Sequence, residues 1–316
     1  MRKLRVGVVG VGHLGQHHAR LYAAVSGAKL VGVTDADAKR AESVAERYGA
    51  QAYADLDRLL PHVDAVSVVV PTSAHHSVVK TCLNAGVHVL VEKPVTVTVD
   101  EAYDLVESAR VKGRVLQVGH IERFNPAIQA VRPYLNKPGF IECHRLSPYG
   151  ERGTDVDVVL DLMIHDLDMI LSMNPGQVED VRAAGVPVLA NTIDIANARI
   201  AFTNGCVANL TASRVSMARM RKLRLFQRDA YITVDYQARQ AAILRRRMGP
   251  NQRLEIEMEP VRTVDEEPLR LELEAFVLAA STGTKPVVSG EDGAAALALA
   301  HQVLAAIAAF VQRNEG

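Results

Sequence analysis

Residues 4–15 read LRVGVVGVGHLG, a Val-rich run that passes directly into glycines spaced as GxGxxG. In such a turn Gly10 permits a tight bend, Gly12 lets the backbone approach a pyrophosphate, and Gly15 allows the next helix to pack closely on the strand. The helix start adds unpaired N–H groups and the positive end of its dipole. The stretch therefore predicts the strand, turn and helix of a dinucleotide-binding unit. The expected cofactor contacts of this turn are Gly10, Gly12, His13, Leu14 and Gly15.

Asp35 closes the next apolar run, 20 residues after Gly15. A carboxylate at this place can accept hydrogen bonds from both hydroxyls of an adenosine ribose. Because its charge would repel a 2′-phosphate, the sequence favours NAD over NADP. The alternative is a packing turn followed by a helix N-cap aspartate, which leaves the joint spacing of the glycines and the acid unexplained.

Up to residue 119, Val-rich apolar runs alternate with segments of helical period. Strands that are apolar on both faces belong in a parallel sheet covered by helices on both sides. Thr98 and Glu101 have the spacing of a helix capping box. The alternation predicts an α/β fold with a doubly wound parallel sheet, an NAD-binding Rossmann domain over residues 1–120. The expected strands are 5–10, 29–35, 64–71, 88–93 and 115–120, and the expected helices are 13–24, 36–48, 77–85 and 99–112.

After residue 119 several strands follow one another without helices between them. Asn204 and Gly205 suit a tight hairpin turn, because both residues can adopt positive φ. Adjacent strands imply an antiparallel sheet, so residues 121–316 are expected to form an α+β domain. The expected strands here are 139–147, 193–202, 206–213, 222–227, 231–236, 241–247 and 253–258, and the expected helices are 126–135, 158–173, 268–282 and 291–313.

The composition narrows the classes of function. The 316 residues contain 36 Lys and Arg and 36 Asp and Glu, so the formal net charge is zero. Nucleic-acid binders usually carry a basic excess, and we expect no nucleic-acid partner. Cys82, Cys143 and Cys206 are odd in number and form no CxxC pair. This argues against a disulfide framework or a structural zinc site and favours a reducing compartment.

Two apolar segments could be mistaken for targeting or membrane segments. The first follows Arg2 and Lys3, but glycines interrupt it and no small-residue cleavage site follows. The second, residues 294–311, is Ala-rich and interrupted by His301 and Gln302, so a packed helix is expected rather than a membrane span. We therefore expect a soluble, cytoplasmic protein with no membrane partner.

The segment Val91-Glu92-Lys93-Pro94 places a lysine at the carboxyl end of the predicted strand 88–93. Open α/β sheets bind ligands at this edge. Pro94 restricts Lys93 to an extended conformation. Lys93 could hydrogen-bond a substrate hydroxyl beside the nicotinamide; taken alone, a solvated loop lysine would be the more common arrangement.

The predicted helix 158–173 and its approach carry a polar stripe of Asp157, Asp161, His165 and Asp168 at spacings of four, four and three, which places them on one helical face. An imidazole titrates near neutral pH, as a general base for a hydroxyl proton requires. Asp161, one turn earlier, could orient His165 or stabilise its cation. A solvent face with incidental acids and a carboxylate–histidine metal site remain open as alternatives.

Four segments together resemble the Gfo/Idh/MocA family of nicotinamide-dependent oxidoreductases over nearly the whole chain: GVGHLG at 10–15, PTSAH at 71–75, EKP at 92–94, and Asp161 with His165. The resemblance implies an open-faced, mainly antiparallel sheet in residues 121–316 that binds substrate and forms a homo-oligomer, a dimer or tetramer. It also implies that Lys93 and His165 are the catalytic pair, with Asp161 beside them. The further cofactor contacts that it implies are Pro71, Thr72, His75, Glu92 and Lys93.

Within the family, QVGHIERFNP at 117–126 and RGTDVD at 152–157 look most like the branch that oxidises UDP-N-acetylglucosamine at the sugar 3-hydroxyl, as in assembly of 3-amino lipid A precursors. The guanidinium groups of Arg123 and Arg152 suit a pyrophosphate, because they bind phosphate oxygens bidentately. The alternative is that both are ordinary surface arginines. Family members also oxidise inositols and free aldoses, and some relatives are non-catalytic NAD-binding regulators, so these functions remain open. No metal is expected in the site. The residues expected to bind the substrate are Lys93, Arg123, Asn125, Arg152, Asp161 and His165.

Residues 214–228 and 245–247 are rich in arginine and lysine. On strands, alternation would place such charges on one face, where they could recognise phosphate or pair with acids of another subunit. We favour the ordinary interpretation, a solvated or salt-bridged sheet edge that the charges protect from aggregation.

Overall fold

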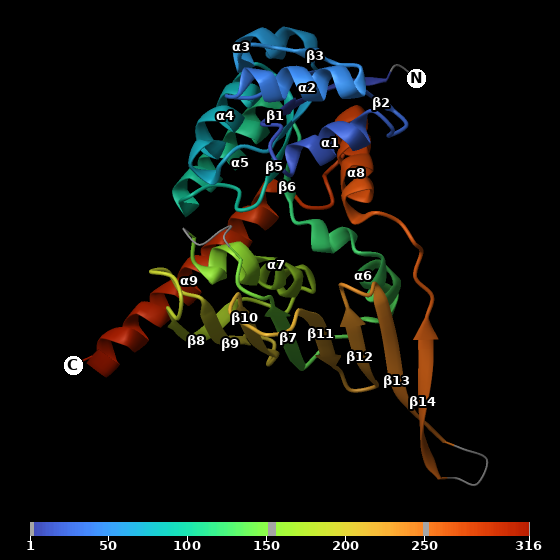
Figure 1. Ribbon diagram of the computed structural model, residues 1–316. Helices are drawn as coiled ribbons and strands as arrows, with labels where there is room; N and C mark the ends of the chain where they lie inside the picture. The colour runs from blue at the N-terminus through green and yellow to red at the C-terminus, as the bar shows by residue number, and fades with distance from the viewer. Residues whose placement is uncertain (1–2, 151–155, 249–252, 316) are drawn as a thin grey trace. The chain divides into compact units, whose positions relative to one another are not determined.

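The computed structural model describes residues 3–150, 156–248 and 253–315 (Figure 1). The chain forms two compact units. The first contains Met1–Ile121 and Glu266–Ala294, and the second contains Glu122–Asp265 and Ala295–Gly316. A segment near the C-terminus therefore belongs to the first unit, together with the N-terminal residues.

The first unit is built on a six-stranded parallel sheet in the order β3-β2-β1-β4-β5-β6. The order reverses direction at β1, as in a doubly wound fold, and confirms the predicted sheet. The edge strand β3 was not predicted, because two residues are too short to show a period. The bounds are β1 Leu4–Val9, β2 Ala28–Thr34, β3 Gln51–Ala52, β4 Ala65–Val68, β5 His88–Glu92 and β6 Leu116–Gly119.

Helices cover both faces of this sheet (Figure 1). Helices α1, α2 and α8 share one core with the strands, in which Tyr22 of α1 and Phe276 of α8 are fully buried. Helices α4 and α5 pack against each other. Helix α4 begins at residue 72, five residues before the predicted start at 77. The prediction missed this start because the first turn of the helix is polar and shows no apolar periodicity. The bounds are α1 Gly15–Tyr22, α2 Ala38–Tyr48, α3 Leu56–Leu59, η1 Leu60–His62, α4 Thr72–Asn84, α5 Val99–Lys112 and α8 Pro268–Thr282.

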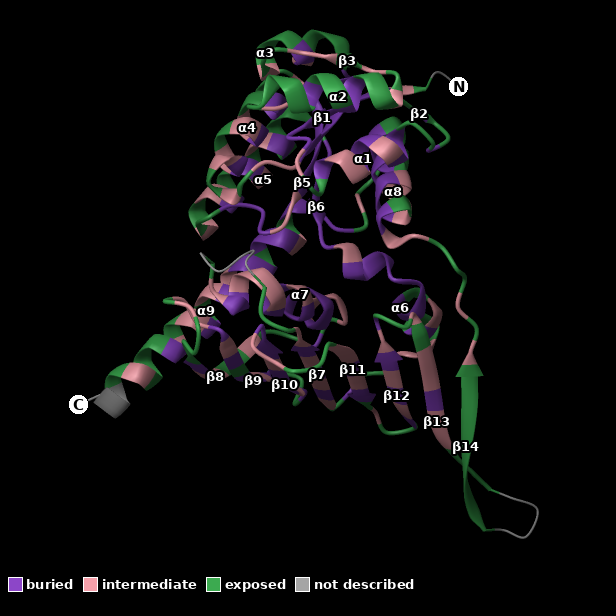
Figure 2. Ribbon diagram, viewed as in Figure 1, coloured by how far each residue is buried: buried purple, intermediate pink, exposed green. Residues whose placement is uncertain are grey.

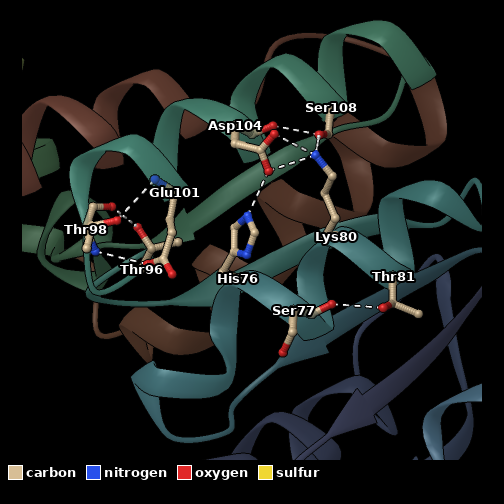
Figure 3. Close-up of polar contacts among 9 residues, drawn as sticks. All are labelled: His76, Ser77, Lys80, Thr81, Thr96, Thr98, Glu101, Asp104 and Ser108. Carbon is tan, nitrogen blue, oxygen red and sulfur yellow. Dashed lines mark hydrogen bonds and ion pairs between the residues drawn. The ribbon is translucent and has the colours of Figure 1, made fainter.

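A polar cluster joins α4 to α5 (Figure 3). Asp104 of α5 accepts hydrogen bonds from His76 Nε2 at 2.7 Å and from Lys80 Nζ at 2.7 Å. The same figure shows the predicted capping box at the start of α5, where Thr98 Oγ1 accepts from the Glu101 N–H and the Glu101 carboxylate accepts from the Thr98 N–H. Both features hold the helix that precedes β6.

The second unit contains an eight-stranded sheet in the order β14-β13-β12-β11-β7-β10-β9-β8. All neighbouring pairs are antiparallel except β10 with β7, so the sheet is mainly antiparallel, as predicted. The turn between β9 and β10 confirms the predicted hairpin, with Gly205 at φ 84°, but Asn204 does not adopt the positive φ that was expected of both residues. The mostly half-exposed strand β8 was not predicted. The bounds are β7 Phe140–Leu146, β8 Val178–Val186, β9 Ile195–Phe202, β10 Val207–Ser213, β11 Met220–Phe226, β12 Ala230–Asp235, β13 Gln240–Met248 and β14 Leu254–Val261.

One face of this sheet is buried and the other is open. Burial alternates along β7, β9 and β12, which Figure 2 shows as alternating bands of colour. The buried face packs on α6 and α7 and on the apolar side of α9, with Ala296, Val303 and Ile307 in the shared core. The bounds are η2 Ile121–Phe124, α6 Pro126–Val131, η3 Arg132–Tyr134, η4 Val159–Met163, α7 Ile164–Ser172 and α9 Gly290–Glu315.

Residues Gly290–Gln312 of α9 form a helix long and apolar enough to cross a membrane by length and composition alone. The same test is passed by core helices of proteins without a membrane span. In this structure α9 contributes Leu299 and Ala300, both almost fully buried, to the core of the second unit. That packing agrees with the packed helix expected for residues 294–311.

Candidate active site

The first unit contains a groove of about 800 Å³ at the carboxyl ends of its parallel strands. The turn after β1, the end of β2 and the ends of β4 and β5 form its walls. This is the edge at which open α/β sheets bind ligands. The predicted cofactor residues that line the groove are Gly10, Gly12, Leu14, Asp35, Pro71, Thr72, His75, Glu92 and Lys93.

The glycines of the turn serve different steric purposes. Gly10 has φ +85°, and a Cβ there would lie 2.6 Å from the Val69 carbonyl oxygen. A Cβ on Gly15 would lie 1.9 Å from the Gly10 carbonyl oxygen, so this glycine lets α1 pack on the strand without lining the groove. Beside Gly12 the nearest atom that a Cβ would meet is Arg40 Nη1, at 3.9 Å. The backbone at Gly12 is therefore open to a ligand.

Asp35 is held at the end of β2 by backbone donors. Its Oδ2 accepts from the Val11 N–H at 2.7 Å, and its Oδ1 accepts from the Asp37 N–H at 2.9 Å. Arg40 Nη1 donates to the same Oδ1 at 3.3 Å and also lines the groove. These contacts fix the position of the carboxylate at the groove. Arg40 was not predicted, because nothing in the local pattern separates it from other exposed helix arginines.

His75 holds two loops together at the floor of the groove. Its ring nitrogens face the Pro94 carbonyl oxygen at 2.8 Å and the Val70 carbonyl oxygen at 2.9 Å. Burial lowers the pKa of His75, against the opposing effect of these two backbone contacts. A neutral ring donates to one carbonyl, and this contact ties the turn after β4 to the loop that follows Lys93. His13, in contrast, is exposed and contacts the ring of His17.

Glu92 is fixed next to Lys93 by a histidine that the sequence did not indicate. The fully buried His18 of α1 places Nε2 3.1 Å from Glu92 Oε1, and the Lys93 N–H donates to Glu92 Oε2 at 3.4 Å. A Cβ on Gly119 would lie 2.8 Å from Glu92 Oε2, so the glycine at the end of β6 makes room for the carboxylate. The Lys93–Pro94 peptide bond is cis.

In the second unit, Asp161 and His165 lie four residues apart where η4 continues into α7. Both side chains are half-buried, whereas the intervening Met163 and Ile164 are fully buried. The helix therefore presents the carboxylate and the imidazole on an accessible side. Lys93 belongs to the first unit, and these two residues belong to the second.

The predicted stripe was wrong at its two ends. Asp157 Oδ1 accepts from the Ile193 N–H at 2.9 Å, before the helix begins. Asp168 is fully buried and paired with Arg123. The π-turn Val159–Met163, which has more residues per turn than an α-helix, separates Asp157 from the later residues. Asp168 lies with His165 in the regular helix α7, on its buried side, where it reaches Arg123. Asp161 and His165 are half-buried within the helix, whereas Asp157, also half-buried, precedes the helix and Asp168 is fully buried.

The contacts of Arg123 and Asn125 are those of scaffold residues, which corrects the prediction that they bind substrate phosphate or sugar. Arg123 Nε and Nη2 donate to the two oxygens of Asp168 at 2.8 and 2.6 Å. Asn125 Oδ1 accepts from the Ala127 N–H at the start of α6, and its Nδ2 donates to the Tyr236 carbonyl oxygen. Both side chains are buried. Arg152 lies outside the described residues.

A buried ionic network anchors α7 to the sheet. Arg145 of β7 donates to Asp166 through Nε and Nη2 at 2.9 and 2.8 Å, and to Glu122 Oε1 at 2.8 Å. The guanidinium also lies over the Tyr236 ring, 5.4 Å from its centroid. Asp166 directly follows His165, so the network fixes the helix that carries the predicted base. Its members are far apart in sequence, and no local pattern could have joined them.

Within the described ranges, no group of three or more His, Cys, Asp or Glu side chains could hold a metal ion. The donors gathered around the groove instead fit a dinucleotide. A backbone open at Gly12, a turn shaped by Gly10, and the oriented Asp35 carboxylate match a pyrophosphate and an adenosine ribose.

Residues 4–120 match the family model described as "Oxidoreductase family, NAD-binding Rossmann fold", and residues 129–233 match "GFO/IDH/MocA C-terminal domain". The chain is 41% identical to UDP-N-acetylglucosamine 3-dehydrogenase of Acidithiobacillus ferrooxidans, over 99% of this chain and 100% of that protein. It is 31% identical to scyllo-inositol 2-dehydrogenase (NAD(+)) of Bacillus subtilis, over 68% of each chain.

Solved structures give the same grouping. The UDP-N-acetylglucosamine 3-dehydrogenase GnnA from Acidithiobacillus ferrooxidans superposes with a TM-score of 0.92 at 40% identity, covering 98% of this chain and 99% of that one. Levoglucosan dehydrogenase in complex with NADH and levoglucosan shares the fold, with a TM-score of 0.87 at 18% identity over 97% and 98% of the two chains. The chain belongs to the Gfo/Idh/MocA family of NAD-dependent oxidoreductases.

Proposed function

We propose that the protein oxidises the 3-hydroxyl of the sugar in UDP-N-acetylglucosamine to a ketone. The observation that carries this proposal is the 41% identity to a UDP-N-acetylglucosamine 3-dehydrogenase along the whole of both chains. Two inositol dehydrogenases that are 31% and 33% identical are matched over only 68% of this chain. Oxidation of an inositol or a free aldose is therefore the less supported alternative.

In this proposal, His165 accepts the proton of the sugar hydroxyl, and Asp161, four residues earlier, orients the imidazole and stabilises its cation. The ammonium of Lys93 stabilises the developing alkoxide. Glu92, held by His18, positions the backbone of Lys93. The role of these residues is to orient the hydroxyl and to remove its proton.

When NAD is bound, it supplies the acceptor for the hydrogen that leaves the sugar carbon. The residues that would hold it in the first unit are those of the glycine turn for the pyrophosphate and Asp35 for the adenosine ribose. Pro71, Thr72, His75 and Glu92 would line the nicotinamide end. A 2′-phosphate would meet the Asp35 carboxylate, which supports NAD over NADP.

We assign NAD binding to residues 1–120 and substrate binding and oligomerisation to residues 121–316. The segment 266–294, which folds with the first unit, would support the cofactor site from α8. We also propose a place in the cytoplasm, which the three free cysteines support, and a part in making 3-amino lipid A precursors, which the proposed substrate supports.

The open face of the second sheet supports a homo-oligomer. Phe140, Phe226, Tyr231, Leu244 and Met258 are cross-strand neighbours on the face that points away from the buried core, and we call them the aromatic band. The rings of Phe226 and Tyr231 lie 4.9 Å apart, and Met258 is 67% exposed. An apolar band of this kind on a sheet favours association with a second copy.

The direct test is NADH formation from NAD with UDP-N-acetylglucosamine, compared with inositols, free aldoses and N-acetylglucosamine. The proposal predicts the highest kcat/KM on the UDP-sugar and a keto sugar as product. Higher kcat/KM on an inositol would overturn the substrate assignment. Tight NAD binding without turnover of any compound would instead favour a non-catalytic regulator.

A further inference from the structure

Arg221, at the start of β11, is a half-buried arginine without an acidic partner. In the described part of the chain, its guanidinium forms no hydrogen bond and no ion pair. Placing a charged group in a partly desolvated position without a partner is unfavourable. Such a position is retained where a ligand supplies the missing charge.

Unlike Arg221, other arginines of the second unit form ion pairs with acidic side chains. Three arginines of the second unit are almost fully buried, and each is paired with a buried acid: Arg123 with Asp168, Arg145 with Asp166, and Arg214 with Asp194. The other charges of the same strand also have partners, since Lys222 lies 3.9 Å from Asp235 and Arg224 lies 2.8 Å from Glu142. These two pairs show the salt bridging that we favoured from sequence, but the predicted sheet edge was wrong, because β11 lies between β12 and β7. Arg221 departs from this pattern of pairing.

The sheet register places Arg221 on the same face as the predicted base. Arg221 is the direct antiparallel partner of Arg145 on β7, so the two side chains emerge on one face, with Cβ atoms roughly 5 Å apart. Arg145 reaches Asp166 of α7, and Asp166 directly follows His165. Arg221 therefore lies beside the helix that carries His165, on the side of the sheet that this helix covers.

The charges around Arg221 leave it available for an anion. The two carboxylates of Asp166 and Glu122 are already bound to Arg145. Burial lowers the pKa of Arg221, and the nearby charges of Arg145 and Arg219 lower it further, while Glu122 and Asp166 partly oppose the shift. Arg219, two residues earlier, is exposed and also has no carboxylate partner among the described residues. Arg219 and Arg221, at the start of β11, therefore form no ion pair with any carboxylate of the described residues.

We propose that Arg221 binds the diphosphate of the nucleotide-sugar substrate, with Arg219 as a second, exposed contact. The inference rests on the proposed function. A guanidinium fork binds phosphate oxygens bidentately, and a nucleoside diphosphate would supply to Arg221 and Arg219 the anionic oxygen atoms that no described carboxylate places within hydrogen-bond distance of them. The pyrophosphate of NAD does not compete for this site, because its cradle is the glycine turn of the first unit. Arg221 would hold the sugar in place for His165.

The test compares Arg221→Gln, Arg221→Lys and the parent chain, each full length and saturated with NAD. The probe is UDP, titrated by calorimetry, and the kinetic readouts are KM for UDP-N-acetylglucosamine and KM for NAD. We expect Arg221→Gln to weaken UDP binding about tenfold or more and to raise the sugar KM in parallel, with the NAD KM unchanged. Arg221→Lys, which keeps the charge and loses the fork, should recover part of the affinity.

The matched control is Arg132→Gln, which removes an exposed arginine of the same unit on η3 and should leave UDP binding unchanged. Melting midpoints show whether each variant is folded, and Arg221→Lys carries the same test if Arg221→Gln does not fold. Unchanged UDP binding in the folded Arg221 variant would overturn the inference. Loss of inorganic phosphate binding alone, with UDP binding intact, would overturn it too, because the site would then serve free phosphate.

The outcome is separable from that of the proposed function. A parent chain that oxidises UDP-N-acetylglucosamine while the Arg221 variants bind UDP normally would reject this inference only. A parent chain that neither binds UDP nor oxidises the UDP-sugar would reject the proposed function and the inference together.

Discussion

At the scale of single residues, the proposed chemistry depends first on His165. We expect His165→Ala to lower kcat about a hundredfold or more, because the sugar hydroxyl would lose its general base. The affinity for NAD, measured by fluorescence titration, should stay close to that of the parent chain, since the cofactor groove belongs to the other unit. Turnover equal to that of the parent chain would remove His165 from the mechanism.

The choice of cofactor is a second property of single residues. Asp35→Asn removes the charge that repels a 2′-phosphate and frees Arg40 from its contact with Asp35 Oδ1. We expect the ratio of kcat/KM for NAD to that for NADP to fall at least about tenfold. Asp57→Asn, at an exposed position near the groove, is the control and should leave the ratio unchanged. A constant ratio in Asp35→Asn would show that Asp35 does not set the preference.

The sequence predicted those groove residues whose signal is local. The glycine turn and Asp35 follow from a linear motif whose spacing has a steric reason. His18, Arg40 and the network of Arg145 with Asp166 and Glu122 join segments far apart in the chain, so no short pattern contains them. Arg123 was read as a phosphate ligand because a guanidinium alone does not reveal its partner, which is the buried Asp168.

At the scale of elements, η2 is joined to α7 by the buried pair of Arg123 and Asp168. Asp168→Ala would leave an uncompensated buried guanidinium, and we expect a loss of about 3–5 kcal/mol in the free energy of unfolding. The matched control is Asp180→Ala, which breaks the exposed pair with Arg182 and should cost less than about 1 kcal/mol. Urea unfolding measures both, and equal losses in the two variants would contradict this account.

The link between α4 and α5 should make stability depend on pH. Hydrogen bonds from Lys80 and then His76 hold the pKa of Asp104 below its ordinary value. A lowered pKa in the folded state stabilises the protein above the unfolded pKa, and this contribution disappears as the pH falls through the folded pKa. The site is partly exposed, so screening limits the effect to about 0.5–1 kcal/mol.

We therefore expect Asp104→Asn to be less stable than the parent chain at pH 7 and the difference to shrink below about pH 4. Urea unfolding at a series of pH values would show it. The exposed Asp100→Asn, in the first turn of the same helix, is a control for the general loss of a carboxylate. A difference that stays constant from pH 7 to pH 3 would rule out the proposed linkage.

The local periodicity of apolar residues predicted most of the helices and strands but not all of their geometry. The five principal parallel strands and the main helices follow from period and turn signals, whereas β3 is too short and β8 too exposed to show one. The stripe on helix 158–173 was wrong at Asp157, which precedes the π-turn Val159–Met163, because a π-turn changes the phase that the α-helical period assumes. It was wrong at Asp168 because this residue lies on the buried side of α7 and pairs with Arg123. π-turns occur frequently at functional sites, and this one carries Asp161.

At the scale of the whole molecule, the aromatic band should control assembly. Phe226→Asp places a charge between Phe140 and Tyr231, and we expect the mass measured by light scattering to fall toward that of a monomer. Tyr103→Asp, on an exposed tyrosine of α5, is the control and should leave the mass unchanged. Retention of the full oligomer in Phe226→Asp would exclude the band as the interface.

The assignment of chain segments to the two units could be predicted only in part. After residue 119 the predicted strands no longer alternate with helices, and this change separates the parallel sheet from the mainly antiparallel sheet of the structure. The return of α8 to the first unit rests on Leu273 and Phe276, which pack beside Tyr22 of α1. An apolar helix face does not identify its partner, so this contact becomes visible only in three dimensions.

The central claim, oxidation of the sugar at carbon 3, is tested most directly by isotope transfer. UDP-N-acetylglucosamine carrying deuterium at sugar carbon 3 is mixed with the NAD-saturated protein, and the reduced cofactor is analysed by mass spectrometry. The account predicts singly deuterated NADH together with a 3-keto sugar nucleotide. Reduced cofactor without deuterium, or no reduction at all, would contradict it.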